Sequence, residues 1–294
     1  MIELRVASTD DDYASWAAIK TAVIPNEPQT AESLRATDDD ARLLLVASVE
    51  GVDAGCGVGN LSGFGGLAFF GVCVLPEHRG RGVARELTRA LCDHARALGR
   101  EGVNAFVDAA EPESLAVALH YGLAQVDYQL QQERAVGDEP PPPRLPGVEV
   151  ASVDGRREEL LRAAWPLAQE AYEDLPLPGS VTYPIETWLR DEATVPGGSF
   201  IAFELGEVVG WAGLNEHADD GTAEHGLTAV RRDRRGRGLG RALKQAQLHW
   251  AAQNGLGTLT TWTQQGNERM QGLNRSLGYR DVSKVLTMQG PLPL

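Results

Sequence analysis

The sequence repeats itself across its midpoint, and this repeat constrains the fold more than any other feature. Residues 74–84 align with residues 230–240 at an offset of 156 residues. Two further anchors keep nearly the same spacing: Gly51 and Gly55 align with Gly206 and Gly210, and Gly122 aligns with Gly278. Three anchors in one order predict a tandem duplication, in which both copies adopt the same architecture.

A proline-rich segment separates the two copies. Residues 136–147 include four successive prolines, Pro140–Pro143, which neither a helix nor a central strand accommodates. We therefore expect an N-terminal domain at residues 1–135 and a C-terminal domain at residues 148–294, joined by this linker. Both lengths are normal for a single domain.

The second copy indicates the order of elements within one domain. Apolar residues recur at helical spacing in three segments, 158–172, 239–253 and 267–277. Apolar or β-branched runs predict strands at 199–204, 208–214, 224–230, 258–263 and 282–288. This order predicts an α/β fold, in which each domain is a mixed twisted sheet with helices on both faces.

Composition narrows the possible partners. The chain of 294 residues carries a formal net charge of −14, which disfavours nucleic acid and anionic membranes. Its three cysteines are too few and too scattered for a disulfide framework or a zinc site. It has neither an apolar run of transmembrane length nor a basic-flanked leader. We expect a cytoplasmic monomer or homodimer without a metal site.

Each copy carries a glycine-rich loop between a strand and a helix. Glycine lets the backbone approach a ligand closely, and the first N–H groups of a helix lack internal partners at the positive end of its dipole. This combination binds phosphate. Residues 231–241 hold six arginines and one aspartate within an acidic chain, which predicts a polyanionic ligand. A loop that merely caps a helix is the alternative, and the second copy makes it less favoured.

The loop pattern Arg-x-x-Gly-x-Gly/Ala resembles the acyl-CoA pyrophosphate loop of the GNAT N-acetyltransferase superfamily. Residues 267–279 resemble the C-terminal helix motif of that family, and the likeness covers both copies. The resemblance implies acetyl-CoA as the cosubstrate. In the second copy it assigns acetyl-CoA binding to Val230, Arg235, Gly236, Arg237, Gly238, Leu239, Gly240, Arg241, Asn267 and Asn274. In the first copy it assigns the same role to Val74, Arg79, Gly80, Arg81, Gly82, Val83 and Ala84.

The resemblance also implies how the reaction proceeds. A primary amine attacks the thioester directly, a carboxylate removes its proton, and a strand N–H polarises the thioester carbonyl. Counting back six residues from Val230 assigns the base to Glu224, and counting back two assigns the N–H to Thr228. The same six-residue count in the first copy reaches Ala68, which has no titratable group. We therefore expect the second domain to be catalytic and the first to be degenerate.

The predicted function is transfer of acetyl from acetyl-CoA to a primary amine of a small metabolite or antibiotic. Two alternatives stay open: a non-catalytic acyl-CoA-binding or sensing module, and a protein N-acetyltransferase. His217 is an alternative base. Asn274 stands where many family members have a tyrosine that protonates the leaving thiolate, so the general acid is also open.

Overall fold

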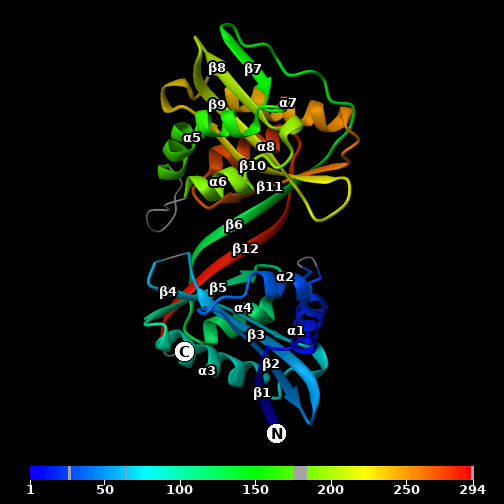
Figure 1. The fold of residues 1–294 in the computed structure, drawn as a ribbon, viewed down its shortest axis with the longest axis vertical. Coiled ribbons are helices and arrows are strands. Elements are labelled where there is room, and N and C mark those ends of the chain that lie inside the picture. Colours follow the sequence, from blue (N-terminus) through cyan, green and yellow to red (C-terminus); the bar gives the residue numbers. More distant parts are fainter. Residues whose placement is uncertain (26–27, 64, 175–183, 293–294) are drawn as a thin grey trace. The chain divides into compact units, whose positions relative to one another are not determined.

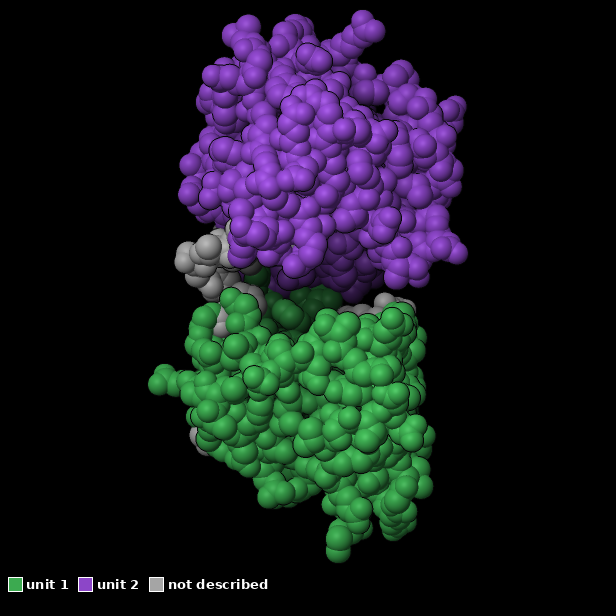
Figure 2. All heavy atoms as spheres, viewed as in Figure 1, with its two compact units in different colours: residues 1–127, 285–294 green, residues 128–284 purple. Residues whose placement is uncertain are grey.

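The computed structural model describes residues 1–25, 28–63, 65–174 and 184–292, which fall into two compact units (Figures 1 and 2). Unit 1 comprises residues 1–127 and 285–294, and unit 2 comprises residues 128–284. Within each unit, parallel and antiparallel strands lie side by side with helices on both of their faces. This architecture confirms the predicted α/β fold.

Unit 1 has the strand order β1-β2-β3-β4-β5-β12. Its strands are β1 (Ile2–Val6), β2 (Leu43–Val49), β3 (Val52–Leu61), β4 (Leu67–Val74), β5 (Gly102–Asp108) and, from residue 285 on, β12 (Arg280–Pro291). Its helices are α1 (Asp10–Val23), α2 (Ala31–Ala36), α3 (Val83–Ala97) and α4 (Pro112–His120). β4 and β5 run parallel. α1 and α2 pack on one face through Trp16 and Leu34, whereas α3 lies over the glycines of β3 on the other face.

Unit 2 has the order β6-β11-β10-β9-β8-β7. Its strands are, from residue 128 on, β6 (Ala124–Ala135), then β7 (Val148–Ser152), β8 (Phe200–Glu204), β9 (Glu207–Glu216), β10 (Thr222–Val230) and β11 (Thr258–Gln264). Its helices are α5 (Arg157–Glu173), α6 (Ile185–Asp191), α7 (Leu239–Gln253) and α8 (Glu268–Ser276). β10 and β11 run parallel. α5 and α6 cover the face of Trp211 and Ala229, and α7 covers the face of Ala212.

Each half of the sequence contributes its last strand to the other unit. β6 follows α4 of unit 1 along the chain, yet residues 129–135 pair with β11 of unit 2. β12 follows α8 of unit 2, yet residues 285–291 pair with β5 of unit 1. The compact units therefore cut across the domains expected at residues 1–135 and 148–294. Apolar periodicity does not distinguish the two arrangements, because the duplicated sheets offer equivalent edges.

The proline-rich segment packs on unit 2. Arg134 donates to both carboxylate oxygens of Glu139, at 2.6 and 2.7 Å. His249 of α7 donates from Nδ1 to the backbone carbonyl of Glu139 at 2.8 Å. Leu145 packs against the apolar core beneath α7. These contacts bring the end of the segment beside the N-terminus of α7.

Two glycines that anchor the repeat have a packing role. A Cβ on Gly55 would lie 2.9 Å from Cγ1 of Val83 in α3. A Cβ on Gly210 would lie 2.9 Å from Cδ1 of Leu243 in α7. Each glycine thus lets the helix that follows the glycine-rich loop lie close against the sheet. The repeat conserves this helix position in both units.

We predict that Gly55→Ala destabilises the protein. The new Cβ would lie 2.8 Å from the backbone carbonyl oxygen of Cys73, which cannot turn away as a side chain can. Overpacking of this kind costs about 1–3 kcal/mol of unfolding free energy, so the melting temperature should fall by several degrees. Gly137→Ala is the control, because its Cβ would meet nothing within 4 Å. Equal melting temperatures for both variants would contradict the packing role.

Candidate active site

β10 and β11 diverge in the middle of unit 2. They pair only over Thr222–Glu224 and Thr258–Thr260, and beyond this β10 continues along β9. The N–H of Arg231 donates to the carbonyl of Val209 in β9 at 3.0 Å. Because strand residues alternate in direction, the N–H of Thr228 faces away from β9, toward the opening left by β11. The structure therefore places a backbone donor at the opening, on the residue that the sequence indicated.

A β-bulge interrupts β10 just before this donor. Gly226 and Leu227 of β10 together oppose Gly213 of β9. A bulge adds one residue to the strand and so reverses the side-chain alternation beyond it. Val230 accordingly packs toward α7, on the face opposite to Glu224. The six-residue count from Val230 to Glu224 therefore spans a change of face.

Glu224 lies on the face that α5 and α6 cover. Its neighbour His225 donates from Nδ1 to Oε1 of Gln247 in α7 at 2.9 Å, on the opposite face. Burial raises the pKa of Glu224 above its ordinary value, although the charge of His217 and a hydrogen bond from Trp262 lower it in part. A half-buried carboxylate with a raised pKa has the properties of a general base.

The Thr228 side chain adds a polar group near the opening. Its Oγ1 is buried and has no hydrogen-bond partner among the described residues. Buried hydroxyls are normally satisfied, so an orphan beside an opening indicates a place that a ligand or water completes. The Oγ1 and the N–H of Thr228 are therefore two polar groups that β10 places near the opening.

The loop after β10 prepares the N-terminus of α7 for an anion. Gly236 and Gly238 adopt φ values of +77° and +85°. Gly238 is the N-cap of α7, and no described side chain caps the helix. The first-turn N–H groups, on Leu239, Gly240 and Arg241, are therefore available to a ligand. A phosphate group fits such a helix terminus.

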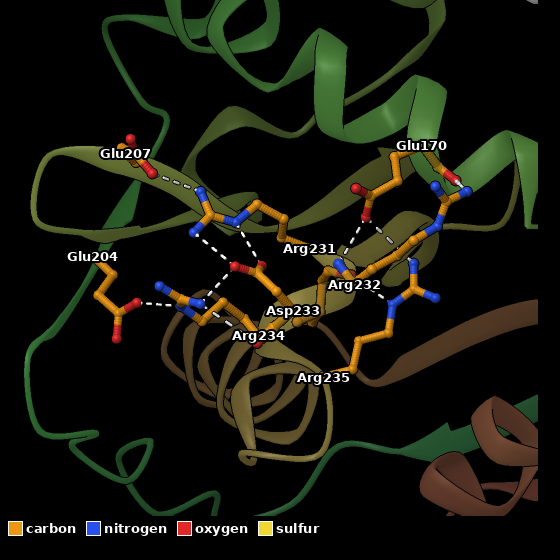
Figure 3. A network of polar contacts seen from close by, with 9 residues as sticks. Glu170, Glu204, Glu207, Arg231, Arg232, Asp233, Arg234 and Arg235 are labelled. Atoms are coloured by element: carbon orange, nitrogen blue, oxygen red, sulfur yellow. Dashed lines mark hydrogen bonds and ion pairs between the residues drawn. The ribbon is translucent and has the colours of Figure 1, made fainter.

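Most of the arginine charge in this loop is neutralised within unit 2 (Figure 3). Four arginines pair with carboxylates: Arg231 with Glu207 and Asp233, Arg234 with Glu204 and Asp233, and Arg232 and Arg235 with Asp174. Figure 3 shows Arg232 and Arg235 directed toward α5, which carries Glu170. These arginines connect the loop to α5 and to the β8–β9 hairpin. They therefore fix the conformation of the loop and add little net positive charge to it.

Arg235, the arginine of the motif, braces the start of the loop. Its Nε donates to the carbonyl of Val230 at 2.8 Å. Arg237 and Arg241 form no ion pair with the described residues. Arg237 lines a hollow with Leu145 and Leu239, and Arg241 donates to Oγ of Ser276 at 2.6 Å. These two arginines are the cations best placed to meet a polyanion at the loop.

The two asparagines from the C-terminal motif occupy different surroundings. Asn267 is the N-cap residue of α8 and is partly exposed. Asn274 is fully buried, and its Nδ2 donates to Oε1 of Gln132 in β6 at 2.9 Å. The structure thus places Asn274 in a polar part of the core rather than on the glycine-rich loop.

Unit 1 repeats the loop in detail. Gly80 has φ +73°, and Gly82, the N-cap of α3, has φ +88°. Arg79 donates from Nε to the carbonyl of Val74 at 3.4 Å, as Arg235 does in unit 2. The remaining positions follow the same order: Arg81 is exposed, and Val83 and Ala84 open α3. The backbone geometry for an anion is therefore present twice.

Unit 1 does not repeat the bulge. β4 pairs with β3 in one continuous register, from Val74 opposite Gly55 to Ala68 opposite Leu61. Without the extra residue, Ala68 points to the α3 face together with Val74. The residue that shares the face of Glu224 is therefore Phe69, one position later than the simple count gives. Neither side chain can accept a proton.

Sequence reasoning missed one charged residue of this region, Glu192. It follows α6 directly, and its carboxylate accepts hydrogen bonds from Trp211 and from the N–H of Leu227 in the bulge. The available signal was the pair Gly213 and Gly226, since an isolated glycine in a strand often marks a bulge or a close approach.

Three observations concern the properties that the composition led us to expect. Cys56, Cys73 and Cys92 are buried thiols. Across the described ranges, no three His, Cys, Asp or Glu side chains gather as a metal-ligand set. None of the described helices combines the length and the apolar character that a bilayer crossing requires. His217, the alternative base, lies beside Asp219, and its charge lowers the pKa of Glu224 in part.

Sequence comparison decides the family. The profile of the acetyltransferase (GNAT) family matches residues 10–122 and 159–279. The chain belongs to the GNAT acetyltransferase family. It is 31% identical over 289 residues to the mycothiol acetyltransferase of Thermomonospora curvata, covering 95% of this chain and 92% of that protein. It is 32% identical to the mycothiol acetyltransferase of Frankia alni, covering 83% and 79%.

Solved structures share the tandem GNAT architecture. A GCN5-related N-acetyltransferase from Sphaerobacter thermophilus superposes with a TM-score of 0.79 at 20% identity, over 100% of this chain and 96% of the other. A tandem GNAT protein from the clavulanic acid biosynthesis pathway superposes with a TM-score of 0.74 at 19% identity, over 100% and 99%. At these identities the likeness shows the fold alone. The two separate matches to the family profile make this chain a tandem GNAT acetyltransferase.

The two loops allow a matched test of which GNAT unit carries the reaction. We predict that Gly238→Asp lowers acetyl transfer by roughly 100-fold, because a carboxylate at the N-terminus of α7 repels an anionic ligand. Gly82→Asp should leave most of the activity. Gly82 and Gly238 have nearly equal φ values, so both variants carry the same backbone strain. Product formation and melting temperature are measured for both, and the opposite order of activities would assign the reaction to unit 1.

Proposed function

We propose that unit 2 transfers acetyl from acetyl-CoA to a primary amine of a small molecule, with Glu224 as the general base. One observation carries this proposal. Where β11 leaves β10, the same strand offers a half-buried carboxylate of raised pKa and a backbone N–H turned to the opening. Acyl transfer to an amine needs these two groups together.

The residues around the opening fit acetyl-CoA. The N–H groups at the start of α7, with Arg237 and Arg241, would hold its pyrophosphate. The gap between β10 and β11 would take the thioester arm, next to the orphan hydroxyl of Thr228. Bound there, acetyl-CoA supplies an activated acyl group on a thiolate leaving group. Asn267, at the N-cap of α8, would contribute to acetyl-CoA binding. The buried Asn274 would support that binding only indirectly.

The proposed chemistry uses Glu224 and Thr228 in distinct roles. An alkyl ammonium must lose a proton before its nitrogen can attack, and the carboxylate of Glu224 accepts that proton. The amine nitrogen then forms a bond to the carbonyl carbon, the carbon–sulfur bond breaks, and the nitrogen gives up its second proton to the departing thiolate or to solvent. The N–H of Thr228 stabilises the negative charge that develops on the carbonyl oxygen. A CoA thiolate is a good leaving group, so this scheme needs no general acid from the protein.

The names of the relatives narrow the amine substrate. Those relatives are mycothiol acetyltransferases, and the chain covers nearly the full length of the first of them. We therefore propose a mycothiol-related amine as the first substrate to test, within the wider class of small-molecule amines. For unit 1 we propose acyl-CoA binding without turnover, because it keeps the loop but has Phe69 and Ala68 where a base would stand.

We predict that Glu224→Gln lowers kcat by roughly 100- to 10,000-fold, the usual contribution of a positioned base. The melting temperature and the affinity for CoA should stay close to wild type. In the wild type, kcat/KM should fall as the pH drops through the raised pKa of Glu224, because the protonated carboxyl cannot accept a proton. Mass spectrometry of the acetylated amine measures the rate without interference from thiols on the substrate.

Glu216→Gln is the matched control, since Glu216 is exposed on the neighbouring strand β9. It should keep wild-type activity. Full activity of Glu224→Gln would show that another group is the base, with His217 the next to be tested. If the wild type acetylates none of a broad amine panel that includes mycothiol-related amines, the binding-module alternative gains support.

A further inference from the structure

Glu192 is a buried carboxylate that the proposed transfer does not use. The residue is only 7% exposed. Its Oε1 accepts from Nε1 of Trp211 at 2.9 Å, and its two oxygens accept from the N–H of Leu227 at 3.1 and 3.3 Å. Burial raises its pKa to about 7, while these donors and the charge of Arg157 lower it in part. A carboxylate held in this way costs desolvation free energy, so its position calls for an explanation.

The carboxylate occupies space that two glycines leave. A Cβ on Gly213 would lie 1.7 Å from Oε1 of Glu192, and a Cβ on Gly226 would lie 2.6 Å from both carboxylate oxygens. These are the glycines that oppose each other across the bulge of β10. Any side chain at either position would displace the carboxylate, so the bulge, the two glycines and Glu192 form one arrangement.

The bulge creates the donor that Glu192 satisfies. In a regular antiparallel ladder, the N–H groups of alternate residues bond to the neighbouring strand. The extra residue of a bulge is left without a ladder partner. Here the N–H of Leu227 donates to the carboxylate of Glu192. Without that acceptor, the buried N–H would favour a return to the regular register.

Unit 1 provides an internal comparison. Where the described parts of β3 and β4 pair, the register has no shift. A Cβ on Gly71 of β4 would lie 3.0 Å from Cγ1 of Val58, so an apolar side chain fills the place that corresponds to the carboxylate. The unit without the bulge is also the unit without a candidate base. The arrangement around Glu192 therefore accompanies Glu224 and not the glycine-rich loop, which both units have.

We propose that Glu192 is a positioning residue for acetyl transfer: its carboxylate holds the Gly226–Leu227 bulge and so keeps the N–H of Thr228 at the opening while Glu224 lies on the α5–α6 face. This role rests on the function proposed for unit 2. The regular register would place Glu224 and Thr228 on one face, as it does for Ala68 and Val72 in unit 1. Glu192 acts through the backbone and does not touch the reacting atoms.

Two substitutions of Glu192 distinguish the effect of its acceptor oxygens from the effect of the space that its side chain fills. Glu192→Gln keeps an oxygen that can accept from both Trp211 and Leu227. Glu192→Met has a similar length and fills the same space, but it offers no oxygen. Steady-state kcat, the KM for acetyl-CoA and the affinity for CoA are measured for both variants, with the amine that the wild type acetylates.

We expect Glu192→Met to lower kcat by roughly 10- to 100-fold, the usual effect of misplacing a reacting group by about 1 Å. Its KM for acetyl-CoA and its affinity for CoA should stay within about threefold of wild type, because the loop before α7 is unchanged. Glu192→Gln should recover most of the wild-type kcat. Wild-type kcat in Glu192→Met would overturn the proposal, as would a loss of CoA affinity in parallel with kcat, which would indicate general misfolding.

An NMR measurement on the wild type tests the contact without relying on activity or on a variant that folds poorly. The amide proton of Leu227 should shift with pH as Glu192 titrates, with a midpoint near the pKa of about 7. The charge of Arg157 acts on Glu192, and that of His217 acts on Glu224, so these are the other charged or titratable groups near this face. The Glu192→Gln variant should lose the shift of Leu227. A Leu227 resonance that stays constant in the wild type between about pH 5.5 and 8.5 would overturn the contact, even if acetyl transfer is observed.

Discussion

The candidate site depends on two places where the backbone pairing of β10 is interrupted, one with β11 and one with β9. β10 pairs with β11 only at its start, and a bulge interrupts its register with β9 where the N–H of Leu227 donates to Glu192. The first change opens a gap beside Thr228, and the second reverses the side-chain alternation between Glu224 and Val230. Glu192 satisfies the displaced donor from within the core. A regular strand with the same residues would not present this combination of groups.

Most of the arginine charge near the loop before α7 is neutralised by carboxylates of unit 2. The chain is acidic overall, yet residues 231–241 contain six arginines. Four of them are paired with carboxylates from unit 2 and hold the loop in place. Recognition of an anion is then left mainly to the N-terminus of α7, with Arg237 and Arg241 nearby. The same helix terminus recurs in unit 1 with fewer arginines, which supports the view that the backbone is the common element of both loops.

The sequence allowed the duplication, the α/β fold and both glycine-rich loops to be predicted, because each depends on local patterns such as glycine spacing and apolar periodicity. It did not reveal that β6 and β12 lie in each other's expected sheets, since equivalent edges accept either strand. It also did not reveal the bulge, because one extra residue does not disturb the apolar pattern enough to be recognised. Because of the bulge, the count of six residues reached Ala68 in unit 1, whereas Phe69 is the residue that shares the face of Glu224. Glu192 was missed because it is distant in sequence from β10.

A crystal structure of the protein with bound acetyl-CoA tests the central claim most directly, because it locates the thioester carbonyl relative to β10. We expect the carbonyl oxygen to lie about 3 Å from the backbone nitrogen of Thr228. We also expect the pyrophosphate to lie on the loop before α7 and the bulge at Gly226–Leu227 to be intact. An acetyl group bound only in unit 1, or one bound in unit 2 away from Thr228, would contradict the account.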